Sequence, residues 1–171
     1  IYPGHIKARK GLNNVTKQFL NNGNKAYKRG DLEKALVYYQ DAVSYDDQFY
    51  LAFYQLGVLE KKMGNSDMAI TYLNKVINIK PDFQKAWFTL GTSYEADNNL
   101  DSAINKYNRA IELDSNYTKA FGNLGNVYIS KEEYELAINV LNKAILIDPE
   151  YADGYLRLGV AYNEQEKFQE A

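Results

Sequence analysis

The sequence predicts an all-α protein of helix pairs that repeat every 34 residues, and two sets of recurring residues predict it. The first set is a Leu-Gly pair, and the second is a series of single alanine and aromatic positions with the same spacing. No insertion breaks the spacing, which is typical of an architecture in which each unit packs against its neighbours. The members are Leu56-Gly57, Leu90-Gly91, Leu124-Gly125 and Leu158-Gly159; Ala35, Ala69, Ala103, Ala137 and Ala171; and Phe19, Phe53, Trp87, Phe121 and Tyr155.

Each repeat has the pattern of a helix, a short polar loop and a second helix, and residues 84–117 illustrate it. The stretch WFTLGTSY places Trp87, Leu90, Gly91 and Tyr94 at i, i+3, i+4 and i+7, so we expect a first helix over residues 84–96. The polar stretch DNNL follows as a loop, and residues 101–113 are expected to form the second helix. The apolar face of that second helix consists of Ala103, Ile104, Tyr107, Ala110 and Ile111.

Turn-forming residues and prolines mark the ends of these helices. Loop signals recur at Gly30-Asp31, Gly64-Asn65 and Asn98-Asn99, while Pro81 and Pro149 end two of the second helices. An acidic residue stands in the first turn of each second helix, where the positive end of the helix dipole favours it. These residues are Glu33, Asp67, Asp101 and Glu135.

Gly91 is unexpected inside a helix, because glycine there costs about 1 kcal/mol relative to alanine. We expect it to face Ala103 and Ala110, so that two helix axes approach closely while larger side chains fill the flanks. Its equivalents Gly57 and Gly125 should then be buried at helix contacts in the same way.

The motif W-x-x-L-G-x-x-Y, followed by Ala103 and Tyr107, resembles the tetratricopeptide repeat. The resemblance covers residues 16–171 and implies a right-handed superhelix of antiparallel helix pairs. Some positions depart from the motif: Asn22 replaces the leucine of the first repeat and Glu60 the tyrosine of the second, while Asp47 and Ser115 stand where other repeats have proline.

The repeat register predicts the domain organisation. Residues 1–15 form an N-terminal helical extension or cap, in which Ile6, Leu12 and Val15 suggest a helix and YPGH suggests the closing turn of something upstream. The repeats are residues 16–49, 50–83, 84–117, 118–151 and a partial 152–171, which stops as its second helix begins. We expect a boundary within a longer protein there, and cover by another molecule over Leu158 and Tyr162.

Composition excludes several function classes. The apolar fraction of 46% and the charged fraction of 25% are those of a soluble globular chain, and no apolar run approaches a membrane span. A formal net charge of −2 gives no basic field for nucleic acid, so no nucleic-acid partner is expected. Cysteine and a signal core are absent, which leaves the compartment open between the cytoplasm, as the default, and the periplasm.

No catalytic or metal-binding constellation can be assembled from the sequence. His5 is the only histidine, and it lies in the irregular start of the chain, where a solvated side chain is expected. The glycines of GNLGN fall inside a helix and not after a strand, so they form no phosphate-binding loop. We therefore expect no enzyme activity, no cofactor and no metal.

What remains for function is a stripe of residues on each first helix that packing does not require. In the family, such residues resemble the inner wall of the superhelix, a groove that holds an extended peptide or a partner's helix. The stripe and its flanks carry more lysines than acids, which indicates either simple solubilising charge or a preference for acidic peptides. The candidate groove residues are Lys17, Asn24, Tyr54, Lys61, Lys62, Lys85, Phe88, Thr92, Lys119 and Asn126.

Three functions fit this pattern. The first is a protein-interaction scaffold whose groove binds another protein, the second is the regulatory or substrate-recruiting arm of a larger enzyme such as a glycosyltransferase, and the third is head-to-tail self-association. Binding of chaperone C-terminal tails, which some members of the family perform with lysine, asparagine and arginine, is disfavoured. The best register offers Asn123 and Arg157 but places Asp153 where it would repel the ligand.

Overall fold

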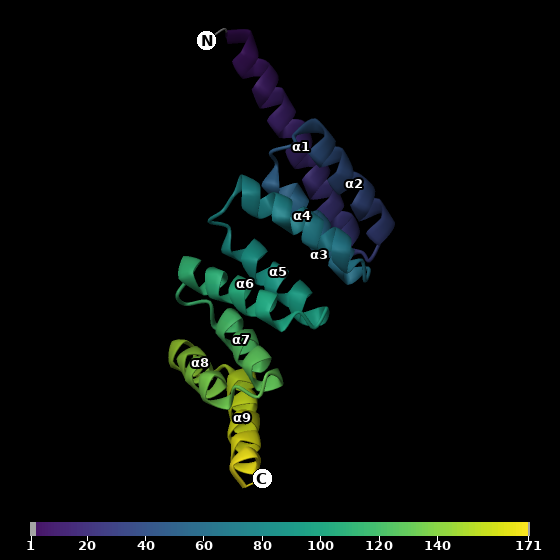
Figure 1. Ribbon diagram of the computed structural model, residues 1–171. Coiled ribbons are helices and arrows are strands. Elements are labelled where there is room, and N and C mark those ends of the chain that lie inside the picture. The colour runs from purple at the N-terminus through teal and green to yellow at the C-terminus, as the bar shows by residue number, and fades with distance from the viewer. Residues whose placement is uncertain (1–2, 171) are drawn as a thin grey trace. The chain divides into compact units, whose positions relative to one another are not determined.

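A computed structural model describes residues 3–170, and the side chains of residues 14–166. Over residues 3–170 the chain forms nine α-helices and no strand, so the expected all-α fold is confirmed (Figure 1). The helices are α1 (Pro3–Lys28), α2 (Leu32–Tyr45), α3 (Tyr50–Lys62), α4 (Ser66–Ile79), α5 (Gln84–Ala96), α6 (Leu100–Leu113), α7 (Thr118–Ser130), α8 (Tyr134–Ile147) and α9 (Ala152–Glu170).

The chain divides into two compact units, Ile1–Pro81 and Asp82–Ala171. In unit 1, α1 packs against α2 and α3 against α4, and α2 joins the two pairs by packing on α3. In unit 2, the pairs are α5 with α6 and α7 with α8, and α6 packs on α7 while α8 packs on α9. Each unit thus buries the apolar faces of its helices against the next helix along the chain.

The four turns inside the helix pairs share one backbone feature. Gly30, Gly64, Asn98 and Glu132 follow one another at the repeat spacing, and each has a positive φ, with values of 81°, 85°, 56° and 61°. Glycine adopts this left-handed region freely and asparagine tolerates it, whereas a glutamate is strained there. Glu132 is therefore the least favourable of the four turn residues.

Glu132→Gly is expected to raise the free energy of unfolding by about 0.5–1 kcal/mol. The substitution removes the steric penalty of the left-handed conformation, and the larger backbone entropy that glycine loses on folding offsets part of that gain. Gly64→Ala should have the opposite sign, because it introduces the same strain. Urea denaturation of both variants checks this. Glu135→Gly is the control, since Glu135 lies in the first turn of α8 and its replacement should destabilise the helix.

Gly57, Gly91 and Gly125 are buried, as expected, and so are Ala69, Ala103 and Ala137. The residue nearest to Gly91, however, is one that was not predicted to face it. A Cβ atom on Gly91 would lie 2.5 Å from Cε1 of Tyr107, so the ring of Tyr107 lies against the glycine more closely than Ala103 or Ala110. Gly57 holds Leu73 and Gly125 holds Leu141 in the same way. The missing side chain therefore makes room for one large residue of the second helix.

The two ends of the chain also differ from expectation. Residues 3–5 form the first turn of α1 and not a closing turn, which agrees with the preference of proline for that position. The side chain of His5 and those of the other residues before 14 lie outside the described residues. At the other end, α9 continues through Gln165 and Glu166, where the other repeats turn, so no second helix begins there.

Candidate functional site

The stripe predicted on the first helices forms one wall in each unit. The wall of unit 1 is the set of stripe positions on α1 and α3, and the wall of unit 2 is the corresponding set on α5, α7 and α9, in which Gly122 is buried. The wall of unit 1 consists of Lys17, Leu20, Asn24, Tyr27, Lys28, Leu51, Tyr54, Val58, Lys61 and Lys62. The wall of unit 2 consists of Lys85, Phe88, Thr92, Glu95, Lys119, Gly122, Asn126, Ile129, Asp153, Leu156, Val160, Asn163 and Glu164.

The wall of unit 1 is basic and partly aromatic. Lys17 and Lys62 are exposed, while Lys61 and Tyr54 are half-buried. The ammonium group of Lys62 on α3 lies 4.6 Å from the centre of the Tyr27 ring on α1, within the range of a cation–π contact. That contact brings the two first helices together at this surface. The wall contains four lysines and no carboxylate.

Asn24, which was predicted as a groove residue, has a structural partner. Its Oδ1 atom accepts a hydrogen bond from the hydroxyl of Tyr39 at 2.8 Å, and Tyr39 is fully buried. The carbonyl of Asn24 therefore satisfies a hydroxyl that burial would otherwise leave without a partner. Its amide group is the part of Asn24 that this contact leaves for other interactions.

The wall of unit 2 is organised by a polar network around Glu95. The hydroxyl of the buried Tyr107 donates to one Glu95 oxygen at 2.5 Å, and the amide of Asn126 donates to the other at 2.8 Å. The amide of Asn123 donates to the Tyr107 hydroxyl at 3.3 Å, and Arg157 donates to the Asn123 carbonyl at 3.1 Å. Three first helices and one second helix of unit 2 are thus joined by polar contacts.

The remaining candidates of unit 2 fall into two groups. Lys85 and Lys119 are exposed and able to meet a partner. Phe88 is half-buried, with its ring centroid 5.7 Å from that of Tyr107 and 4.9 Å from that of Tyr117, so much of its area already serves packing. The hydroxyl of Thr92 donates to the Thr89 carbonyl of its own helix at 2.9 Å.

The sequence did not single out Glu95 and Arg157 as site residues. Arg157 also lies near Asp153, with a closest separation of 3.8 Å, so the carboxylate expected to repel an acidic ligand is partly neutralised. The sequence held a weak signal of the Arg157 contact, because Asn123 and Arg157 occupy the same position in successive repeats. In the structure the two side chains are joined by a hydrogen bond. Glu95 and Asn126 lie 31 residues apart, and only the packing of α5 on α7 brings them together.

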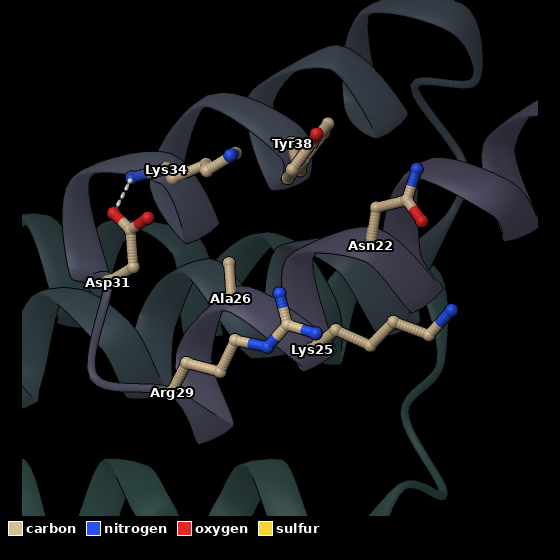
Figure 2. A pocket seen from close by; sticks show the side chains of 7 residues that line it. All are labelled: Asn22, Lys25, Ala26, Arg29, Asp31, Lys34 and Tyr38. Atoms are coloured by element: carbon tan, nitrogen blue, oxygen red, sulfur yellow. Dashed lines mark hydrogen bonds between the residues drawn. The ribbon is translucent and has the colours of Figure 1, made fainter.

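A pocket of about 180 Å³ lies between α1 and α2 of unit 1 (Figure 2). In that view Ala26 lies between Arg29 and Lys34, which come from opposite sides of the pocket. An Asp31 oxygen accepts a hydrogen bond from the backbone amide of Lys34 at 3.2 Å and so caps α2. The residues that line the pocket include three cations and one carboxylate. The sequence did not indicate this pocket, because the pocket does not lie on the first-helix stripe. Its residues are Asn22, Lys25, Ala26, Arg29, Asp31, Lys34 and Tyr38.

Stability at alkaline pH is expected to depend on two buried tyrosines. Burial raises the pKa of Tyr39 to about 12, and burial together with the neighbouring Glu95 raises the pKa of Tyr107 further. The folded state therefore favours the neutral phenols, and the stability that they contribute is complete below the ordinary tyrosine pKa of about 10. It is lost as pH rises from there through the folded-state values.

A titration of tyrosinate absorbance checks this expectation. A late group of tyrosines that includes Tyr39 and Tyr107 should ionise only as the helical signal in circular dichroism disappears. Tyr39→Phe should shift the alkaline unfolding midpoint upward. Ionisation of all tyrosines in one step with the helices intact would contradict the burial argument.

Comparison with known proteins identifies the repeat. The family profile described as "TPR repeat" matches residues 94–131 and 125–166, and the profile described as "Tetratricopeptide repeat" matches residues 50–83. The chain belongs to the tetratricopeptide repeat family. Tetratricopeptide repeats are modules of protein–protein interaction, and the chain is accordingly a protein–protein interaction scaffold. None of the described helices is long and apolar enough to cross a membrane.

Solved tetratricopeptide repeat structures are similar to this chain over most of its length. A crystal structure of MamA protein is 28% identical and covers 89% of this chain and 83% of that chain, with a TM-score of 0.82. MamA 41-end from Desulfovibrio magneticus RS-1 is 22% identical and covers 91% and 92% of the two chains, with a TM-score of 0.80. A chain of the APC/C hetero-tetramer Cut9-Hcn1 is 22% identical and covers 92% of this chain but 33% of its own, with a TM-score of 0.79. At 22% identity the last two show the fold alone. No curated protein matches the chain in sequence.

Proposed function

We propose that the first-helix walls bind an acidic, extended or helical segment of another protein. The observation that carries the proposal is the charge of the wall of unit 1, which has four lysines and no carboxylate although the whole chain is slightly acidic. Lys17, Lys28 and Lys62 are exposed, so burial in the core does not explain them. A positive surface of this kind accelerates the encounter with a negative partner.

The aromatic residues of the walls supply apolar contact beside the lysines. Tyr27 and Tyr54 in unit 1 and Phe88 in unit 2 are half-buried, so each retains exposed ring area. An aromatic ring next to an ammonium group suits a segment in which acidic and apolar residues alternate. The wall of unit 2 is less basic, because Glu95, Asp153 and Glu164 offset its cations. The acidic part of the partner should therefore favour unit 1.

The proposal predicts that binding of an acidic probe depends on the wall lysines and on salt. A variant with Lys61, Lys62, Lys85 and Lys119 replaced by alanine should bind a glutamate-rich helical peptide about tenfold more weakly near 0.1 M salt, as expected for several exposed charges. The difference should shrink toward 1 M salt, where the Debye length falls from about 10 Å to about 3 Å. Fluorescence anisotropy across the salt series measures it.

A matched variant controls for net charge. Replacing Lys34, Lys75, Lys106 and Lys143 by alanine removes the same number of charges from the second helices, and it should leave affinity nearly unchanged. Lys34 also lines the basic pocket, so binding at that pocket would weaken this control variant instead. Equal affinities for the two quadruple variants at every salt concentration would show that the wall lysines only solubilise the chain. The Lys61 and Lys62 pair alone should lose more affinity than the Lys85 and Lys119 pair.

A further inference from the structure

The basic pocket between α1 and α2 lies on a face of α1 that other repeats use for packing. The residues that correspond to Asn22 and Lys25 in α3 and α7 are apolar and buried, and in α7 they belong to one core cluster with residues of the preceding helix α6. These residues are Leu56, Leu59, Leu124 and Val127. An amide and an ammonium group would be costly to bury at such a contact. This face of the first repeat therefore suits a polar ligand and not a helix of the repeat type.

The chain that precedes the first repeat does not fold back over this face within the described residues. Helix α1 has 26 residues, whereas α3 and α7 have 13 each, and the additional residues of α1 precede the first repeat. They continue the axis of α1 in one unbroken helix (Figure 1). The polar character of the face is therefore a property of its own residues.

Three cations line the pocket. Lys25 lies in the last turn of α1, Arg29 in the turn that follows, and Lys34 near the start of α2. All three are exposed, and none of them makes an ion pair with another described residue. The carboxylate of Asp31 accepts a hydrogen bond from the backbone amide of Lys34 instead. Three cations and one carboxylate leave an excess of two positive charges, although the whole chain has a formal net charge of −2.

The size of the pocket limits its ligand to one small group. Its volume of about 180 Å³ is below the roughly 300–1,000 Å³ of sites that hold a drug-sized molecule or a cofactor. A phosphate monoester carries a charge of about −1.5 to −2 near pH 7, which matches the excess charge better than a single carboxylate does. The guanidinium of Arg29 offers a planar fork of donors that fits two phosphate oxygens, and Asn22 and Tyr38 add neutral hydrogen-bonding groups (Figure 2).

We propose that this pocket binds the phosphate group of a phosphorylated serine or threonine on a partner protein. Arg29 donates to two of the phosphate oxygens, and Lys25 and Lys34 supply charge from the two helices. A phosphorylated side chain fits the pocket because it presents one small dianionic group, and a protein partner agrees with the role of the chain as an interaction scaffold. The inference is independent of the function proposed for the walls, because no pocket residue belongs to the wall of unit 1.

The probe is a pentapeptide with phosphoserine between pairs of glycines, and its binding is followed through the backbone amide signals of the chain in nuclear magnetic resonance. We expect saturable shifts within residues 22–38 and a Kd of about 1 mM or tighter. The same peptide with glutamate at the centre should bind about tenfold more weakly, because it carries less charge and fewer acceptor oxygens. Arg29→Gln should weaken binding of the phosphopeptide by about tenfold or more, and Arg29→Lys should weaken it less, since lysine keeps the charge but lacks the fork.

Two matched variants keep the test specific. Lys143→Gln removes an exposed charge from α8 in unit 2, and it should leave the affinity unchanged. The quadruple wall-lysine variant should also bind the phosphopeptide unchanged, which separates this pocket from the walls. The melting temperature of Arg29→Gln should equal that of the wild type, because Arg29 is exposed.

Several outcomes would overturn the proposal. These are absence of saturable binding, equal affinities for the phosphoserine and glutamate peptides, and equal losses in Arg29→Gln and Lys143→Gln. Binding to vesicles that contain phosphatidic acid without binding to the phosphopeptide would identify a lipid headgroup as the ligand, and it would overturn the assignment of a protein partner.

Discussion

Tyr107→Ala is expected to lower the free energy of unfolding by about 3–5 kcal/mol, the range for removing a large aromatic side chain from a core. Tyr107 is fully buried, and its ring fills the space over Gly91 and packs against Phe88. Removing it leaves a cavity at the contact between α5 and α6 and leaves two polar groups without the hydroxyl. Denaturation followed by circular dichroism measures the loss.

Tyr107→Phe separates the hydroxyl from the ring. It keeps the packing but leaves Glu95 and Asn123 short of one partner each, so we expect a cost of about 1–3 kcal/mol. Tyr39→Phe is the control, because its hydroxyl meets Asn24 alone and its loss should cost less, about 0.5–1.5 kcal/mol. An equal cost for the two phenylalanine variants would show that the network around Glu95 adds nothing beyond a single hydrogen bond.

Gly91→Leu is expected to destabilise the chain by about 1–3 kcal/mol or more, through overpacking. Even a Cβ atom would lie 2.5 Å from the Tyr107 ring, which is itself enclosed and cannot move aside without displacing α6. The melting temperature should fall accordingly. An unchanged melting temperature would contradict the packing of Tyr107 on this glycine.

Gly159→Leu is the matched control for Gly91→Leu. It makes the same chemical change at the same position of another repeat, but where no atom lies within 4 Å. We expect stability to remain constant or to rise by up to about 1 kcal/mol, since glycine is a poor helix former. Destabilisation by both substitutions to the same extent would mean that the position in the helix, and not the neighbouring ring of Tyr107, determines the effect.

The repeat pattern predicted the helices well because local signals determine them. Residues 84–96 were predicted as a helix, and α5 spans Gln84–Ala96; residues 101–113 were predicted as its partner, and α6 spans Leu100–Leu113. Periodic apolar residues, turn residues and acidic first turns all agree within one repeat, and such consistency makes a helix boundary predictable. A departure from the pattern lies in α9, which extends to Glu170 through the positions where the other repeats turn.

The candidate site was less predictable, because it depends on contacts between helices. The sequence could place Phe88 on a stripe but not show that Tyr107 and Tyr117 cover much of its ring. It suggested alanines as neighbours of Gly91, because small residues on both helices explain a close approach. It did not show that the ring of Tyr107 lies nearest to this glycine. Whether the wall residues bind a partner stays a prediction.

The hydrogen bonds of Glu95 limit how the repeats could be shuffled by duplication or recombination. One of its oxygens is satisfied within residues 84–117 by Tyr107, but the other depends on Asn126 in the following repeat. The residue equivalent to Asn126 in residues 50–83 is Val58, which has no donor. A chain in which residues 50–83 followed residues 84–117 would keep the apolar periodicity and would leave that carboxylate oxygen without its amide. Repeats with the same apolar pattern are therefore not interchangeable at this junction, because the polar contact there needs a particular side chain from each of the two repeats.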